Sequence, residues 1–192
     1  MKKSIPMNLV VFASGSGSNA VKIIEHFKNH DKINVTNIFC NKESAGIIDE
    51  AKSLGVDVTL FNRDEFKSGV VLEKLKLLDT GFIALAGFLW LVPSQIVNEF
   101  PNKILNIHPA LLPKYGGKGM HGINIHKAVV ENREKESGIT IHLVNEKYDD
   151  GGVIFQEKVN VSRDDTPESL ASKVLKIEHK NYAKVIEKHI LG

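Results

Sequence analysis

Apolar residues along this chain gather in short runs that alternate with stretches of helical periodicity. The run Met7–Ala13 is uninterrupted, which is typical of a strand buried on both faces of a parallel sheet. After it, Val21, Ile24 and Phe27 recur at the spacing of one helix face. The same alternation continues to the C-terminus. It predicts further strands at 34–40, 56–61, 82–88, 104–108, 137–145 and 153–161, and helices at 45–54, 65–78, 93–100, 123–131 and 167–189.

Strands that alternate with helices predict an α/β fold. We expect a doubly wound, mostly parallel, Rossmann-like sheet of about seven strands with helices on both faces, in one domain over residues 1–192. Such sheets bind ligands beyond the carboxyl ends of their strands. The segments 15–19, 87–92 and 108–115 each follow a predicted strand, so all three are expected to line that one edge.

Composition narrows the classes of function. The net charge is +2 and the lysines are scattered, which does not favour a nucleic-acid partner. The single cysteine, Cys40, excludes an intramolecular disulfide and, without a Cys/His cluster, a structural zinc. Lys2 and Lys3 imitate the start of a signal peptide, but the apolar run 9–13 is too short for its core. The longest apolar stretch, 82–92, is too short to span a bilayer, so we expect a soluble cytoplasmic protein.

A glycine-rich loop, SGSGSN, joins the first strand to the first helix. Strand, glycine loop and helix form a cradle in which backbone N–H groups bind a phosphate at the helix N-terminus. Gly15 and Gly17 allow close approach of the backbone, and Ser18 or Asn19 can cap the helix. Ala20 stands where the dinucleotide fingerprint has its third glycine, so a dinucleotide site is not indicated. A simple small-residue turn with a helix cap is about as common for a lone G-x-G, but the buried strand before it favours an anion site.

The stretch ILNIHPALLPKY, over residues 104–115, carries the strongest candidate chemistry. Asn106 and His108 project from the same face of an extended segment, while Ile107 points into the core. Pro109 cannot donate to a sheet ladder, so the strand should stop where His108 is presented. An amide beside an imidazole can hold a carbonyl oxygen and stabilise the charge that it develops under attack. For an isolated N-x-H, a core histidine with a capping asparagine would be the better interpretation.

The stretch is not isolated. LNIHPALLPKY, with SGSGSN before it and HLVNEKYDDGG after it, resembles the motifs of the folate-dependent formyltransferases, in the same order and over essentially the whole chain. The likeness is strongest to the members that act on glycinamide ribonucleotide. It implies transfer of a formyl group from 10-formyltetrahydrofolate, as co-substrate, to the amine of glycinamide ribonucleotide in purine synthesis. It implies two small-molecule substrates, no metal, no nucleic acid or membrane partner, and a monomer or homodimer.

The resemblance also assigns roles to residues. In the catalytic set, Asn106 and a protonated His108 stabilise the oxyanion, and Asp149 orients the imidazole and takes a proton through a water. The residues implied to bind the nucleotide are Gly17, Ser18, Asn19 and Glu178. Those implied to line the slot for the pterin ring of the folate are Phe88, Leu89, Trp90, Leu91, Val92 and Val144. The N-terminal half is thus expected to bind phosphate and nucleotide, and the C-terminal half to be catalytic and to face the folate.

Two adjacent aspartates compete for the catalytic role. Neighbours in an extended chain point to opposite sides, so only one of Asp149 and Asp150 can face His108. In the family the carboxylate comes seven residues after the position of His142 and seven before that of Gln156, and both counts reach Asp149. Asp150 directly precedes a Gly-Gly pair, as the catalytic carboxylate does in some relatives, but both counts disagree with it.

Other assignments have competing interpretations. For Glu178, a solvated carboxylate on a helix is nearly as good an interpretation. A segment such as 88–92 usually packs into the core, with its tryptophan at the surface. Trp90 stands where some members carry arginine, and Leu175 stands where relatives often carry a polar residue. His121 and His126 have no acidic or cysteine partner nearby, which does not favour a metal, although one of them could approach the phosphate.

Rival functions use the same three residues. A deformylating hydrolase and a formyltransferase acting on charged tRNA are both members of the wider family, but they carry an extra domain and a different first loop. A rival of another class is a nucleotide-binding regulatory module that has lost its activity. The intact Asn106, His108 and Asp149 disfavour that module.

Overall fold

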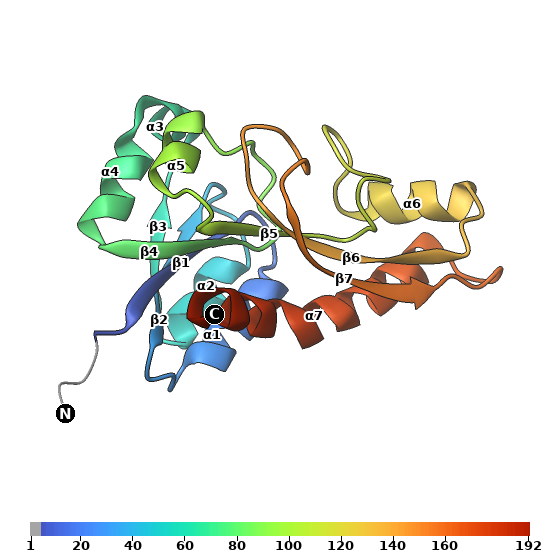
Figure 1. Cartoon of the computed structure of the whole chain (residues 1–192), viewed down its shortest axis with the longest axis horizontal. Coiled ribbons are helices and arrows are strands. Elements are labelled where there is room, and N and C mark those ends of the chain that lie inside the picture. Colours follow the sequence, from blue (N-terminus) through green and yellow to red (C-terminus); the bar gives the residue numbers. More distant parts are fainter. Residues whose placement is uncertain (1–4) are drawn as a thin grey trace.

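In the computed structural model, which describes residues 5–192, the strands form one sheet in the order β3-β2-β1-β4-β5-β6-β7 (Figure 1). The strands are β1 Met7–Ala13, β2 Ile33–Cys40, β3 Asp57–Leu60, β4 Thr80–Leu85, β5 Ile104–His108, β6 Glu136–Leu143 and β7 Val153–Asn160. The pairs β5–β6 and β6–β7 are antiparallel, and the other four pairs are parallel. The doubly wound, mostly parallel α/β fold predicted from the sequence is therefore confirmed.

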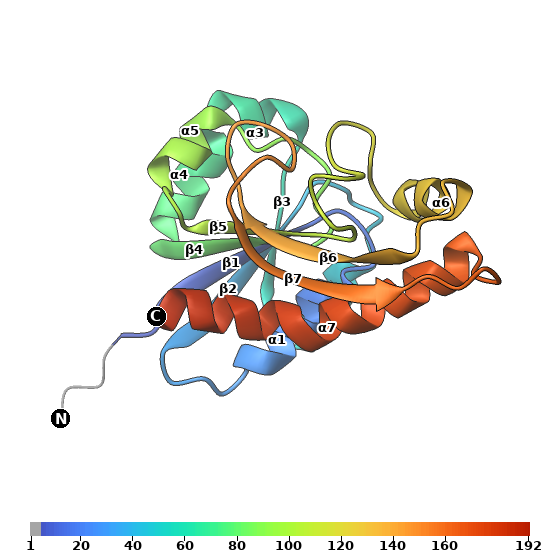
Figure 2. The same cartoon turned by 45° about the vertical axis from the view of Figure 1, so that its right-hand side comes forward.

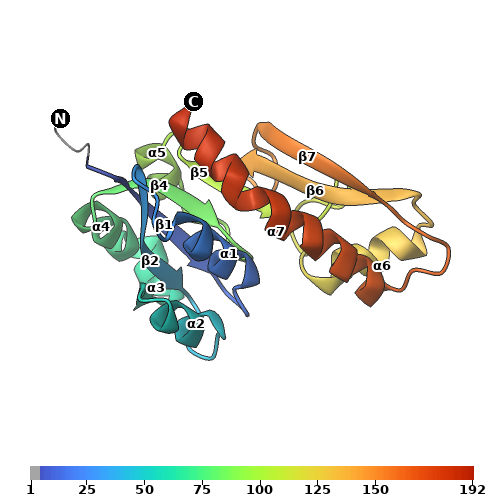
Figure 3. The same cartoon turned by 90° about the horizontal axis from the view of Figure 1, so that it is seen from below.

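The helices cover the two faces of this sheet. They are α1 Ser18–Phe27, α2 Ile47–Ser53, α3 Arg63–Ser68, α4 Val70–Leu77, α5 Ser94–Glu99, α6 Ile123–Glu131 and α7 Pro167–Leu191. Leu9 and Val11 of β1 pack in a core shared with α1, α2, α6 and α7, whereas Val10 and Phe12 pack in a core shared with α3, α4 and α5. This alternation is that of a strand buried on both faces. Figure 3 shows α7 crossing the face that carries Leu9 and Val11, with α1 beside α7 and α2 on the far side of α1.

Two elements differ from their predicted bounds. The single helix predicted at 65–78 is wrong, because Gly69 adopts a left-handed conformation with φ +96° and separates α3 from α4. The strand predicted at 82–88 ends at Leu85, and Gly87 then turns the chain with φ +70°. The other predicted elements agree with the structure to within two residues at each end, which is the ordinary uncertainty of such boundaries.

The last helix, α7, is hydrogen-bonded to the strands that precede the candidate site. It begins at a capping box formed by Thr166 and Ser169. The hydroxyl of its Tyr182 lies 2.9 Å from the carbonyl oxygens of both Leu85 and Leu105, in β4 and β5. The β6–β7 hairpin lies alongside the same helix (Figure 2). α7 is thereby held in a fixed position relative to the ends of β4 and β5.

Over residues 5–192, no helix combines the length and the apolar character that a bilayer crossing requires. In the same part of the chain, no group of three or more His, Cys, Asp or Glu side chains is arranged to hold a metal ion. Cys40 is buried as a free thiol. Lys2 and Lys3, which imitate the start of a signal peptide, lie outside the described residues.

Candidate active site

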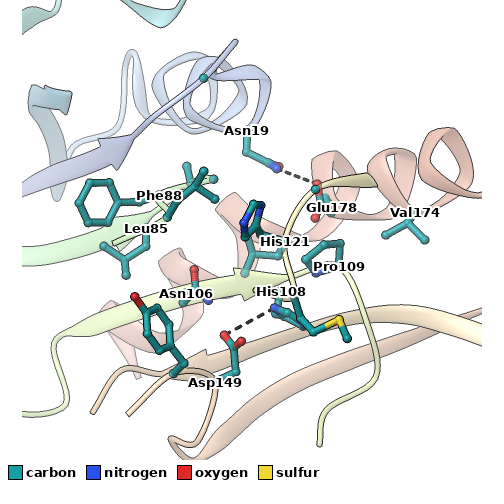
Figure 4. Close-up of a pocket in the computed structure, with 18 of the residues that line it drawn as sticks. Asn19, Leu85, Phe88, Asn106, His108, Pro109, His121, Asp149, Val174 and Glu178 are labelled. Carbon is teal, nitrogen blue, oxygen red and sulfur yellow. Dashed lines mark hydrogen bonds and ion pairs between the residues drawn. The ribbon is translucent and has the colours of Figure 1, made fainter. Parts of the chain in front are cut away.

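A cleft of about 840 Å³ lies along the carboxyl ends of β1, β4 and β5 (Figure 4). It sits where the strand order reverses between β1 and β4, the place at which open α/β sheets bind ligands. Its walls include residues 15–19, 85–92 and 106–109, so the loops that follow these strands do share one edge, as predicted. The loop 117–123 and residues of α7 complete the lining. This volume lies within the range of pockets that enclose small organic ligands.

His108 ends β5 and is almost fully buried, although it borders the cleft. Its Nε2 lies 2.8 Å from the carbonyl oxygen of Tyr115, which can only accept, so Nε2 carries a proton. Its Nδ1 lies 3.5 Å from Oδ1 of Asp149 (Figure 4). Burial lowers the pKa of His108 below 6.5, although the charge of Asp149 and the Tyr115 carbonyl oppose the shift. The protonated His108 predicted from the sequence for the catalytic step stays a prediction.

The carboxylate that faces the imidazole belongs to Asp149. Its Oδ2 accepts the N–H of Gly117 at 2.9 Å, and its Oδ1 faces His108 and, at 3.6 Å, Nε2 of His142. Burial opposes ionisation, but the neighbouring imidazoles and the Gly117 N–H hold the pKa of Asp149 below 3.8, so it is ionised at neutral pH. Asp150 is exposed and does not border the cleft. The structure therefore brings Asp149, and not Asp150, to His108.

Asn106 borders the cleft two residues before His108, and its cross-strand partner in β6 is His142. Nδ2 of Asn106 lies 3.0 Å from Nε2 of His142, whose Nδ1 lies 2.8 Å from the carbonyl oxygen of Leu143. His142 is buried and borders the same cleft, yet it is absent from the site predicted from the sequence. The sequence did contain a signal for His142, which is a polar residue inside a predicted strand. Its pairing with Asn106, 36 residues away, follows only from the antiparallel register.

A second polar pair lies in the cleft apart from this cluster (Figure 4). Glu178 of α7 is buried and accepts a hydrogen bond of 2.8 Å from Nδ2 of Asn19. The solvated carboxylate that was the alternative for Glu178 is therefore wrong. Burial raises the pKa of Glu178 to about 7, and the bond from Asn19 limits the rise. Within the described residues, Oδ1 of Asn19 is buried without a hydrogen-bond partner.

The glycine loop carries the chain from β1 into α1. Gly17 has a left-handed conformation with φ +75° directly before the helix, and no side chain caps it. Capping by Ser18 or Asn19, as predicted from the sequence, is therefore wrong. The N–H groups of the first turn lack partners within the helix and lie in a loop that lines the cleft, as an anion site requires. A Cβ on Gly17 would meet the side chain of Ile47, whereas one on Gly15 would meet no atom within 4 Å.

The segment 88–92, predicted to hold the folate, forms the cleft wall that follows β4. Phe88 and Val92 are buried in the core shared with α3, α4 and α5, and they support the wall from behind. Leu89 and Leu91 are exposed at 47% and 39%, although both border the cleft. Core packing thus accounts for two of these residues, while the exposed leucines leave apolar surface for a ligand.

Trp90 is half-buried at the rim of this wall. Its ring packs at about right angles to Phe61, and the guanidinium of Arg63 lies 4.8 Å from the ring centroid. Val144, from the loop after β6, lines the cleft together with Trp90. Trp90 is therefore held from two sides by the chain itself, which is consistent with a fixed apolar surface.

The three other residues singled out from the sequence, His121, His126 and Leu175, also line the cleft. His121 borders the cleft from an exposed loop, and His126 of α6 is buried, with its Nδ1 unpartnered within residues 5–192. Burial lowers the pKa of His126, and the nearby His108 adds to the shift. Leu175 also borders the cleft and contributes only apolar atoms.

The profile of the formyl transferase family matches residues 7–186. The chain belongs to this family. Phosphoribosylglycinamide formyltransferase of Arabidopsis thaliana, a chloroplastic protein, is 44% identical over 186 residues, which are 93% of this chain and 63% of the relative. The enzyme of the same name from Bacillus subtilis is 33% identical over 189 residues, 95% of this chain and 93% of the relative. The chain thus spans less than two thirds of the plant protein and nearly all of the bacterial one.

Solved structures of the family have the same fold. Phosphoribosylglycinamide formyltransferase from Brucella melitensis superposes with a TM-score of 0.87 at 31% identity, over 98% of this chain and 97% of that one. The glycinamide ribonucleotide transformylase 1 of Geobacillus kaustophilus gives a TM-score of 0.87 at 31% identity, over 98% of this chain and 100% of that one. The match therefore extends from the glycine loop to α7 and includes every wall of the cleft.

Proposed function

We propose that the protein transfers a formyl group from 10-formyltetrahydrofolate to the amine of glycinamide ribonucleotide in purine synthesis. One observation carries the proposal: a single cleft holds an amide, an imidazole and a carboxylate, a helix N-terminus beside a buried carboxyl group, and an apolar wall. These three parts suit, in turn, a formyl group under attack, a phosphorylated ribose and a flat pterin ring. The names of the relatives support the same substrates.

In this proposal, the phosphate of the nucleotide binds to the N–H groups of Ser18 and Asn19 at the start of α1, where the helix dipole favours an anion. Glu178 and Oδ1 of Asn19 accept hydrogen bonds from the ribose hydroxyls. In this proposal the nucleotide site draws on both halves of the chain. The pterin ring lies along the segment 88–92 and Val144. Holding both substrates in one cleft lowers the entropic cost of bringing the amine and the formyl group together.

Asn106, His108 and Asp149 then stabilise the developing charge and transfer protons. A neutral amine attacks the formyl carbon, and the formyl oxygen gains negative charge, which an N–H of Asn106 and the imidazole of His108 stabilise. His108 gives a proton to this oxygen, and Asp149 takes a proton from the attacking amine through a water and returns it to His108. The bond from the carbon to N10 of the folate then breaks. N10 takes up the proton, which leaves the formylated amine and tetrahydrofolate.

A formyl-transfer assay separates this function from its rivals. The protein is incubated with 10-formyltetrahydrofolate, with and without glycinamide ribonucleotide, and the release of tetrahydrofolate is followed. Release that requires the nucleotide supports the proposal, whereas equal release without it indicates a hydrolase. Release that requires charged tRNA instead indicates a tRNA formyltransferase, and tight nucleotide binding without turnover indicates a regulatory module. A cytoplasmic location and a monomeric or dimeric state remain predictions.

A further inference from the structure

His142 lies next to two of the three residues that carry the proposed chemistry. It is buried at the bottom of the cleft, between the amide of Asn106 and the carboxylate of Asp149. Its Nε2 lies 3.0 Å from Nδ2 of Asn106 and 3.6 Å from Oδ1 of Asp149. The first distance is that of a hydrogen bond, and the second is too long for one.

The position of the imidazole proton follows from the other ring nitrogen. Nδ1 of His142 lies 2.8 Å from the carbonyl oxygen of Leu143, and a carbonyl oxygen can only accept. Nδ1 therefore carries a proton, and in the singly protonated ring Nε2 is left as an acceptor. An acceptor at this place selects one orientation of the neighbouring amide, with Nδ2 of Asn106 donating and Oδ1 turned away.

We propose that His142 is a positioning residue that orients the amide of Asn106, so that the second N–H on Nδ2 is presented to the formyl oxygen. The inference rests on the proposed function for its effect on rate. Without an acceptor at Nε2, the amide can rotate by half a turn and present its oxygen to the negative charge of the intermediate. Stabilisation would then become repulsion, although every group in contact with the substrate would still be present.

Two substitutions separate this role from simple packing. In His142→Gln, the amide oxygen reaches the position of Nε2 and can accept from Asn106, so we expect kcat within a few-fold of the wild type. In His142→Leu, the volume is retained but the acceptor is lost, so we expect kcat to fall by roughly 10–100-fold, since removing an oxyanion donor outright costs about 10²–10³-fold. KM for both substrates should change little. If His142→Leu does not fold, His142→Asn, which is polar but too short, replaces it.

A double-mutant cycle identifies the residue through which His142 acts. In an Asn106→Ala background, where no amide remains to be oriented, the further change His142→Leu should have almost no effect on single-turnover rates. In an Asp149→Asn background the same change should retain its full effect. Independent, multiplicative losses in the Asn106→Ala background would overturn the proposal, as would a His142→Gln enzyme as slow as His142→Leu.

Nitrogen NMR of the imidazole tests the arrangement without any turnover. The proposal predicts a protonated Nδ1 and an unprotonated Nε2 for His142, and a shift of the Asn106 amide signal in His142→Leu. A proton on Nε2 would overturn it. If the wild type transfers no formyl group, the proposed function fails, while these signals still decide whether His142 orients Asn106.

Discussion

Replacing Glu178 with glutamine tests whether a protonated carboxyl group is buried in the cleft at neutral pH. The two side chains have nearly the same shape, and the glutamine oxygen can still accept the hydrogen bond that Asn19 donates. Packing is therefore retained. The remaining difference is a proton that Glu178 can lose and glutamine cannot.

The magnitude follows from the pKa of Glu178, which burial raises to about 7 from an ordinary value of 4.5. Below pH 4.5 the carboxyl group is protonated in both the folded and the unfolded chain. The difference in unfolding free energy between the wild type and Glu178→Gln therefore does not depend on pH in this range. Between the two values only the unfolded chain ionises, and the wild type loses about 1.4 kcal/mol of unfolding free energy per pH unit relative to the variant. Above pH 7 the folded chain ionises too, and the loss levels off at about 3 kcal/mol.

Urea denaturation of both proteins at about pH 4.5, 6 and 8 measures this difference. Glu178→Gln should match the wild type at the lowest pH and exceed its stability increasingly toward neutral pH. Glu146→Gln, at an exposed loop residue, is the matched control and should show no such trend. A difference between wild type and Glu178→Gln that stays constant across the range would refute the reasoning.

The remaining predictions concern turnover and substrate binding. In a steady-state assay, Asp149→Asn should lose kcat by roughly 10²–10⁴-fold, because an amide cannot take the amine's proton. Asp150→Asn should stay within a few-fold of the wild type. The reverse order would place the catalytic carboxylate at Asp150. Gly15→Ala adds a methyl group that meets no protein atom within 4 Å, so the fold should be retained. The methyl group should obstruct the phosphate, raise KM for the nucleotide and spare folate binding. Calorimetry showing equal losses for both ligands would contradict the anion loop. Gly17→Val should instead lower the melting temperature, because its side chain would meet Ile47 and its backbone has φ +75°.

Short-range patterns in the sequence located the fold and much of the cleft. Strands buried on both faces produce uninterrupted apolar runs, and their regular alternation with helices was enough to predict a parallel sheet. Asn106 and His108 could be placed side by side because the period of a strand is two. The choice of Asp149 over Asp150 came from the resemblance to the formyltransferases, whose carboxylate lies seven residues from the positions of His142 and Gln156. The break at Gly69 also had a visible signal, a glycine within a helical pattern.

Contacts between distant segments could not be predicted in this way. Asn19 and Glu178 are 159 residues apart, and nothing local shows that the amide turns away from its own helix to meet α7. The pairing of His142 with Asn106 requires the register of two antiparallel strands. The charge of His108 depends on how deeply the folded chain buries its ring, which its neighbours in sequence do not determine.

The central claim is that this cleft moves a formyl group between two bound substrates with His108 at the reacting centre. Its most direct test uses 10-formyltetrahydrofolate labelled with ¹³C in the formyl group, together with glycinamide ribonucleotide, and measures the labelled product by mass spectrometry. The wild type should place the label on the glycinamide nitrogen in equal amount to the tetrahydrofolate released. His108→Ala should bind both substrates and transfer the label roughly 10²–10⁴-fold more slowly. Label released as free formate by the wild type, or near-normal transfer by His108→Ala, would contradict the account.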